Sequence, residues 1–252
     1  MTTIVPVAIG YLLVGTIGLL ATTPVLEFES ITLPQVSHYY AVGFGAVLIY
    51  ALGARLLIGF YHVTPSRVIS WPTLLAGAVA PLLLGMPLWQ EPWFSLGGVL
   101  GAVAMTGYLL LVGFVAVETD RSRVELAGIL CGSLTGVAAV AVGLSVAFGG
   151  GIHDATTLHR TFVLSGFFPL TIVGYAYQFF PVTSGRFPGA TTRGVAAAIG
   201  LLAVGVLVQG IGVVGQIELV RSVGIACSAL GGLGYLYLVT GRFAGWSHAR
   251  GE

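Results

Sequence analysis

Histidine is the residue type in this sequence with the clearest capacity to bind a metal, and the chain contains five of them. A neutral imidazole is a common ligand for iron, copper and zinc. Two imidazoles that face each other across a gap can hold one haem iron from both sides. His38 and His159 are the candidates for such a pair, because each begins a long apolar run.

The residues that follow these two histidines are similar. A glycine lies seven positions after each histidine and another lies fifteen positions after it, and both runs lead to a Val-Thr-x-x-Arg sequence. The matched positions are His38 and His159, Gly45 and Gly166, Gly53 and Gly174, and Val63 to Arg67 and Val182 to Arg186. The register slips by two residues before the Val-Thr pair. The pattern predicts an internal duplication of the chain.

A regular α-helix would bring the positions 4, 7 and 11 residues after each histidine onto the histidine's face. These positions are Val42, Gly45 and Ile49 in the first run, and Val163, Gly166 and Leu170 in the second. Both faces are apolar with a glycine in the middle, and a missing side chain there would let a flat porphyrin lie against the backbone. The alternatives are that the glycines are helix-packing positions and that the histidines form hydrogen bonds at the membrane interface.

The elements that carry these residues are predicted to be membrane spans. The chain has 252 residues, of which 56% are hydrophobic and 8% charged, and its mean hydropathy is +0.99. This number of charged groups is too small to cover the surface of a soluble domain. We therefore expect that a lipid bilayer surrounds the chain. The net charge of +1 gives no sign of a nucleic-acid partner. Eight apolar runs are long enough to cross a bilayer, at about 4–22, 38–62, 71–89, 95–117, 126–148, 159–180, 194–214 and 219–240.

The arginines predict the orientation of these spans. Seven arginines lie in the connections after spans two, four and six and in the C-terminal tail, whereas the other connections contain Arg160 and Arg221. The seven are Arg67, Arg121, Arg123, Arg186, Arg193, Arg242 and Arg250. Positive charge marks the cytoplasmic side, so both termini are expected in the cytoplasm. Trp71, Trp89, Trp93 and Trp246 lie at or just beyond span ends, as an aromatic belt requires.

The predicted fold is therefore an all-α, multi-pass integral protein of the plasma membrane. Residues 1–120 form a first four-helix repeat and residues 121–252 a second. Because each half has an even number of spans, the two repeats are parallel and related by an axis along the membrane normal.

The stretch Leu158-His159-Arg160, Gly166-Phe167, Thr171-Ile172-Val173-Gly174-Tyr175 and Phe180-Pro181 resembles the histidine-bearing helices of the haem-copper oxidase superfamily. The likeness is to nitric oxide reductase large subunits and to NnrS-type membrane haem proteins, and it covers spans two and six. It implies that His38 and His159 bind haem b. The second metal of that superfamily needs an adjacent His-His pair and a His-Pro-Glu element, and this sequence has neither. No reaction at a binuclear centre is therefore expected.

Other polar residues extend the predicted site. Arg160 could pair with a haem propionate, as arginine does with carboxylates. His153 and Asp154 could bind a second metal such as copper, although a solvated loop explains them as well. His62 and His248 are expected at the membrane interface and in the solvated tail. Arg55 lies inside a span, where it could reach toward the cytoplasm or pair with Glu118.

Three functions remain open from the sequence. The first is a membrane haem-b protein, with one haem between spans two and six near the outer face, for electron transfer or for binding a diatomic gas such as NO or O₂. The second is a small-solute transporter made of two repeats, with helices broken at Pro81, Pro87 or Pro169. The third is a structural subunit of a respiratory membrane complex, which would supply a protein partner. No complete catalytic motif is present, so no enzyme activity is assigned.

Overall fold

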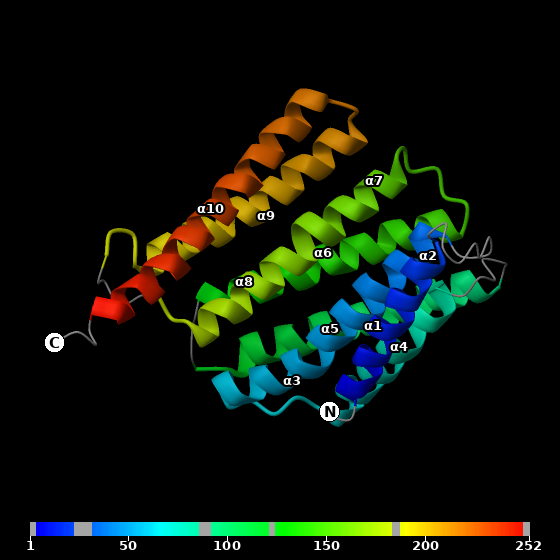
Figure 1. The fold of residues 1–252 in the computed structure, drawn as a ribbon, viewed down its shortest axis with the longest axis horizontal. Helices are drawn as coiled ribbons and strands as arrows, with labels where there is room; N and C mark the ends of the chain where they lie inside the picture. The colour runs from blue at the N-terminus through cyan, green and yellow to red at the C-terminus, as the bar shows by residue number, and fades with distance from the viewer. Residues whose placement is uncertain (1–3, 23–31, 86–91, 121–123, 183–186, 249–252) are drawn as a thin grey trace. The chain divides into compact units, whose positions relative to one another are not determined.

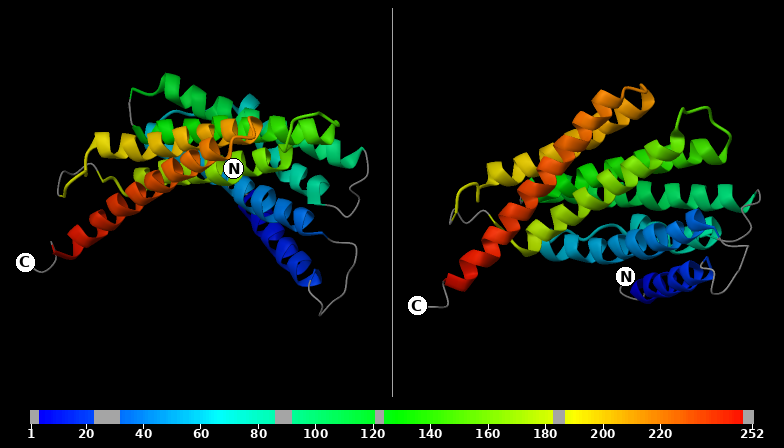
Figure 2. Two further views of the ribbon diagram at one scale, coloured as in Figure 1. Left: turned by 90° about the horizontal axis from the view of Figure 1, so that it is seen from above. Right: turned by 45° about the horizontal axis from the view of Figure 1, so that its top comes forward.

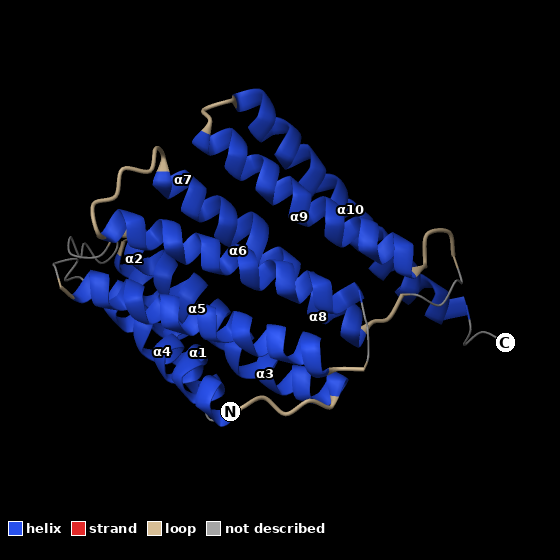
Figure 3. Ribbon diagram, turned by 180° about the vertical axis from the view of Figure 1, so that it is seen from behind, coloured by secondary structure: helices blue, strands red, loops and turns tan. Residues whose placement is uncertain are grey.

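The structure of the protein is a computed structural model (Figure 1). It describes residues 4–22, 32–85, 92–120, 124–182 and 187–248. All regular secondary structure in these ranges is helical (Figure 3). The chain divides into two compact units. The first contains Met1–Thr119 and Gly143–Gly150, and the second contains Asp120–Val142 and Gly151–Glu252.

The described residues of the first unit form four long helical segments. They are α1 (Val5–Ala21), the continuous segment made of α2 (Leu33–His38), η2 (Tyr39–Ala46) and α3 (Val47–Tyr61), then α4 (Arg67–Gly85) and α5 (Trp93–Glu118). The helix α4 packs along α5 and against η2, and α1 also packs against η2. The helix α4 continues through Pro72 and Pro81 without a break, so Pro81 does not interrupt it. Pro87 lies outside the described residues.

The second unit repeats this order of elements. It contains α6 (Val124–Ala147), whose last five residues belong to the first unit, and the continuous segment made of α7 (Ala155–Arg160), η3 (Thr161–Phe167) and α8 (Phe168–Phe179). The helices α9 (Thr192–Val214) and α10 (Glu218–His248) follow. They form an antiparallel hairpin and lie side by side along most of their length (Figures 1 and 2). The helix α9 also packs against η3 and α8.

The lengths and composition of these helices confirm the prediction of a multi-span membrane protein. In the described ranges, seven helical segments are long and apolar enough to cross a bilayer, and α1 is a shorter apolar helix of 17 residues. Large aliphatic side chains are exposed along the helices, for example Ile17 at 65% and Leu110 at 54%. In a bilayer this surface faces lipid. Each predicted span overlaps a helical segment, but the second segment already begins at Leu33 and the last one continues to His248.

Glycines bring the helices of the second unit into close contact. A Cβ added at Gly174 of α8 would lie 2.8 Å from the backbone oxygen of Glu125 in α6. A Cβ added at Gly224 of α10 would lie 2.7 Å from the backbone oxygen of Gly205 in α9. No side chain fits at these positions, so backbones approach directly, as small residues allow in membrane helices. Gln209 of α9 adds a hydrogen bond of 2.9 Å from its amide nitrogen to the Ser228 hydroxyl of α10.

Candidate functional site

His38 and His159 occupy corresponding places in the two units. His38 is the last residue of α2, and η2 begins directly after it. His159 is the last residue but one of α7, and η3 begins two residues later. Both η2 and η3 are π-helical, with wider turns than an α-helix. Among the described residues these two segments are the ones where the helix leaves α geometry within a membrane span.

Each imidazole has its Nδ1 atom at a backbone carbonyl. The Nδ1 of His38 lies 2.8 Å from the Pro34 oxygen, one turn earlier in the same helix. The Nδ1 of His159 lies 2.8 Å from the Ala139 oxygen, which belongs to α6. A carbonyl oxygen can only accept, so in each ring Nδ1 must carry the hydrogen. The neutral ring then has its lone pair on Nε2, which is the atom that can bind a metal.

This arrangement fits a haem iron by its donor chemistry. Histidines that bind metals almost always donate their second ring N–H to a carbonyl, a carboxylate or water, which fixes the tautomer and the ring orientation. Both rings are half-buried and lie near the ends of long apolar helices. His38 belongs to the first unit and His159 to the second.

The π-helical segments change which residues lie below each histidine. The prediction of the haem-facing residues assumed regular α-helical spacing, and this premise is wrong for both segments. A wider turn shifts the face by about one residue per turn. Pro169 follows η3 closely and is a sequence signal for this irregularity, because proline removes a backbone donor and its ring crowds the preceding turn. The segment η2 has no such proline.

The two glycines predicted to face a porphyrin differ in their surroundings. Gly166 is buried, and a Cβ added to it would lie 2.8 Å from the Thr135 Cβ of α6 and 3.1 Å from the Val206 Cγ1 of α9. The missing side chain at Gly166 therefore lets neighbouring helices approach. Gly45 is half-buried, and its place beside a porphyrin stays a prediction.

The loop before His159 is exposed. His153, Asp154 and Arg160 are all exposed. The Asp154 carboxylate accepts a hydrogen bond of 3.3 Å from the Thr157 backbone and caps α7. No group of three or more histidine, cysteine, aspartate or glutamate side chains that could hold a metal ion occurs in the described part of the chain. Asp154 is thus explained by its role as the N-cap of α7. The binding of a second metal by His153 stays a prediction.

The remaining polar candidates lie apart from these histidines in sequence. His62 is exposed, adopts the left-handed conformation at φ 57°, and is the C-cap of α3. Arg55 and Glu118 are both exposed, and the salt bridge found among the described residues, between Arg221 and Glu218, involves neither of them. Arg55 and Glu118 therefore do not pair with each other in this structure. Gln178 is buried.

Several predicted positions lie outside the described residues. They are Trp89, Arg121, Arg123, Arg186 and Arg250. Arg67 and Arg193 lie in the first turns of α4 and α9, Arg242 lies toward the end of α10, and His248 is the last residue of α10.

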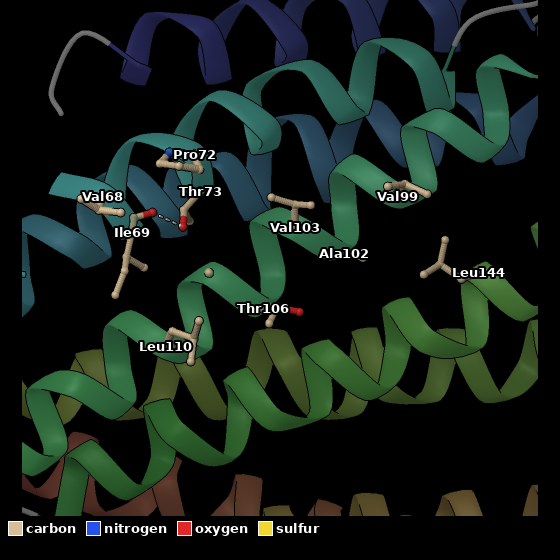
Figure 4. A pocket seen from close by; sticks show the side chains of 11 residues that line it. Val68, Ile69, Pro72, Thr73, Val99, Ala102, Val103, Thr106, Leu110 and Leu144 are labelled. Carbon is tan, nitrogen blue, oxygen red and sulfur yellow. Dashed lines mark hydrogen bonds between the residues drawn. The ribbon is translucent and has the colours of Figure 1, made fainter. Parts of the chain in front are cut away.

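A shallow groove of about 500 Å³ lies on the first unit. Figure 4 shows it along α4 and α5, where the Thr73 hydroxyl donates to the Ile69 oxygen at 2.8 Å. Its lining is almost entirely aliphatic and includes Val68, Val103 and Leu110. None of the predicted site residues lines this groove. Since it lacks charged groups and metal ligands, it offers no chemistry of its own.

Comparison with known proteins gives no family for this chain. No protein-family model, no curated protein and no solved structure matches it. The assignment of a function therefore depends on the local geometry of the two histidines.

Proposed function

We propose that this chain is a haem-b protein of the plasma membrane in which His38 and His159 are the two axial ligands of one iron. The observation that carries the proposal is the shared geometry of the two rings. Each Nδ1 lies at a backbone carbonyl oxygen and each histidine stands at the start of a π-helical segment. π-Helical segments inside α-helices are frequent at functional sites.

The internal duplication that the sequence predicts would support this pairing. With an offset of 121 residues, α2, η2 and α3 correspond to α7, η3 and α8, and the starts of the π-helical segments agree within one residue. The next two helices form a hairpin in both units. We propose that the two halves are parallel repeats with cytoplasmic termini, as the arginine distribution predicts. A twofold axis along the membrane normal would then bring the two histidines to the same depth.

The chain's own residues would hold and insulate the group. Nε2 of His38 and Nε2 of His159 would hold the iron, and the apolar helix faces would exclude water. Arg160 is exposed next to His159, where its guanidinium could pair with a propionate. Thr135 and Val206 lie against Gly166, and its contact with the porphyrin stays a prediction. A haem iron held in this way supplies one-electron transfer, and exchange of one ligand would allow a diatomic gas to bind.

The irregular helices favour this proposal over a transporter. The transporter alternative predicts helices broken at prolines, but α4 continues through Pro72 and Pro81. Pro169 does follow the irregular segment η3, whereas η2 has no such proline and both irregular segments follow a histidine.

The test is the visible spectrum of the detergent-purified protein from haem-replete cells, oxidised and reduced. We expect a Soret band and the sharp reduced α and β bands of iron with two imidazole ligands. The variants His38→Ala and His159→Ala should each lose this six-coordinate spectrum. The variant His62→Asn is the matched control, because His62 is an exposed histidine outside the proposed site and asparagine accepts its left-handed backbone. A folded but colourless wild-type protein would overturn the proposal.

A further inference from the structure

The aliphatic groove on the first unit is as deep as one leaflet of a bilayer. Val68 and Leu110 lie at one end of it, and Val99 and Leu144 lie at the other (Figure 4). The part of α5 that lines the groove extends from Val99 to Leu110, which is a rise of about 17 Å at 1.5 Å per residue. This length is about half of the roughly 30 Å hydrocarbon core of a bilayer, so an acyl chain of one leaflet matches the groove.

Two charged residues lie beyond the end of the groove that Val68 and Leu110 line. Arg67 is the first residue of α4 and directly precedes Val68, and Glu118 is the last residue of α5. Both side chains are exposed. No salt bridge joins Arg67 to Glu118 in the part of the chain that the structure describes. Each charge is therefore available to a ligand.

The packing of α4 on α5 gives the relative heights of these two charges. The two helices form a hairpin, and a Cβ added at Gly107 of α5 would touch the Thr73 side chain of α4. Arg67 lies six residues before Thr73 and is thus level with Gly113, which lies six residues after Gly107. Glu118 follows about 8 Å further out along the helix axis. Side chains lean toward the N-terminus of their helix, so Arg67 leans outward and Glu118 leans inward, toward a common level.

Both charges stand at helix ends that disfavour their sign. The first turn of a helix carries a partial positive charge and the last turn a partial negative one. Arg67 begins α4 and Glu118 ends α5, so neither charge is favoured by the dipole of its own helix. A molecule with one negative and one positive group would be attracted at each place by the side chain and by the helix end behind it.

We propose that the groove and these two residues bind one phospholipid whose headgroup carries a phosphate and a primary ammonium, as phosphatidylethanolamine does. An acyl chain lies in the groove, the phosphate lies at Arg67 and the ammonium lies at Glu118. Arginine binds phosphate with two parallel hydrogen bonds, and an ammonium donates charge-assisted hydrogen bonds to a carboxylate. The site belongs to the first unit alone, and the inference is independent of the proposed haem.

The test is native mass spectrometry of the full-length protein in detergent, titrated with phosphatidylethanolamine or with phosphatidylglycerol of the same acyl chains. Phosphatidylglycerol has the phosphate but no ammonium. The wild type should bind phosphatidylethanolamine about fivefold more tightly. Glu118→Gln should bind the two lipids equally, and Arg67→Gln should bind both about fivefold more weakly. Arg193→Gln is the control for loss of a positive charge, because Arg193 is exposed in the first turn of α9.

A second pair of variants tests the groove without a change of charge. Val103 lines the groove and is 45% exposed, whereas Val79 is 44% exposed on α4 and does not line it. Val103→Phe should fill the groove and weaken the binding of both lipids, while the preference for phosphatidylethanolamine remains. Val79→Phe adds the same ring elsewhere on this unit and should bind lipid as the wild type does.

Three results would overturn the proposal. Equal binding of the two lipids by the wild type would mean that the ammonium is not recognised. A preference that survives Glu118→Gln would remove the carboxylate from the site, and unchanged binding in Val103→Phe would remove the acyl chain from the groove. A wild-type dimer that has no lipid preference and dissociates in Val103→Phe would show that a second copy covers the groove. The wild-type titration decides even where a variant does not fold.

Discussion

Tyr177 is a buried side chain whose hydroxyl has no hydrogen-bond partner in the part of the chain that the structure describes. Its ring packs edge-on against Tyr235 of α10 at a centroid distance of 5.3 Å. The substitution Tyr177→Phe keeps this ring contact and removes a buried group that forms no bond. We expect the free energy of unfolding to stay the same or to rise by about 1 kcal/mol. Unfolding in mixed detergent micelles, followed by circular dichroism, measures it.

Gln209 provides the contrast, because its amide is bonded to Ser228 and, more weakly, to the Gly224 oxygen at 3.4 Å. The substitution Gln209→Leu should lower the free energy of unfolding by about 0.5–1.5 kcal/mol, the range found for interhelical hydrogen bonds in membranes. A loss of stability in Tyr177→Phe that equals the loss in Gln209→Leu would show that the tyrosine hydroxyl does have a partner.

Asp154 caps the helix that carries His159, and its own backbone is left-handed at φ 47°. Alanine would lose the cap bond and tolerate this conformation poorly, so Asp154→Ala should cost about 1–3 kcal/mol. Asparagine keeps the side-chain oxygen and accepts the left-handed backbone, so Asp154→Asn is the matched control. Thermal unfolding of both variants should show a lower midpoint for alanine alone. If the midpoint of thermal unfolding fell equally in both variants, the negative charge of Asp154 would matter instead of its hydrogen bond to the helix.

At the scale of the helix, the contact between α6 and α8 depends on the absence of a side chain at Gly174. An added methyl group would lie 2.7 Å from the Ile129 Cγ1 and 2.8 Å from the Glu125 oxygen. The two backbones would have to separate, and overpacking of this kind costs about 1–3 kcal/mol. We therefore expect Gly174→Ala to lower the midpoint of thermal unfolding in detergent.

The matched control for Gly174→Ala is Gly200→Ala in α9. No atom lies within 4 Å of a Cβ added there, and alanine favours a helix over glycine by about 1 kcal/mol. The control should therefore be as stable as the wild type or more stable. If both variants were equally stable, the close approach of α6 to α8 would not contribute to the fold.

The helices were predictable from the sequence because membrane spans are set by local hydropathy. The span predicted at about 126–148 is apolar and long enough to cross a bilayer, and α6 (Val124–Ala147) follows it closely. The π-helical segments were not predictable in this way. A wider helical turn does not change the hydropathy of the sequence, so the sequence analysis assumed regular α-helical spacing. That spacing put Gly166 on the same helix face as His159 and led to its prediction as a porphyrin contact. The hydrogen bond from His159 to Ala139 depends on how two helices pack, which no local pattern encodes.

At the scale of the whole molecule, the proposed duplication has a physical consequence for its two halves. The order of helices is the same in both units, but different side chains lie between the helices of each unit. In the first unit tyrosines lie there, for example Tyr50, which packs on Gly77 and Tyr108. In the second unit, glycines bring α6 against α8 and α9 against α10. If the two halves are copies, separate drift would produce the same order of helices with different packing, and few residues of the proposed repeat would then still match.

The proposed duplication and the arginine distribution together make a prediction about orientation. If both repeats begin in the cytoplasm, the connection around Gly151 faces outward and the connection around Thr64 faces the cytoplasm. Both residues are exposed and lie between helices, so each can carry a single reporter cysteine. Cys131 and Cys227, which are half-buried within α6 and α10, are first replaced by alanine to remove the background.

In intact cells a membrane-impermeant maleimide should label Gly151→Cys and should not label Thr64→Cys until the cells are opened. The reverse pattern would invert the orientation and move the proposed haem site to the cytoplasmic side. Labelling of both positions in intact cells would contradict an odd number of spans between them. The helical segments α4, α5 and α6 separate Thr64 from Gly151, and an odd number of crossings must place the two cysteines on opposite sides of the membrane.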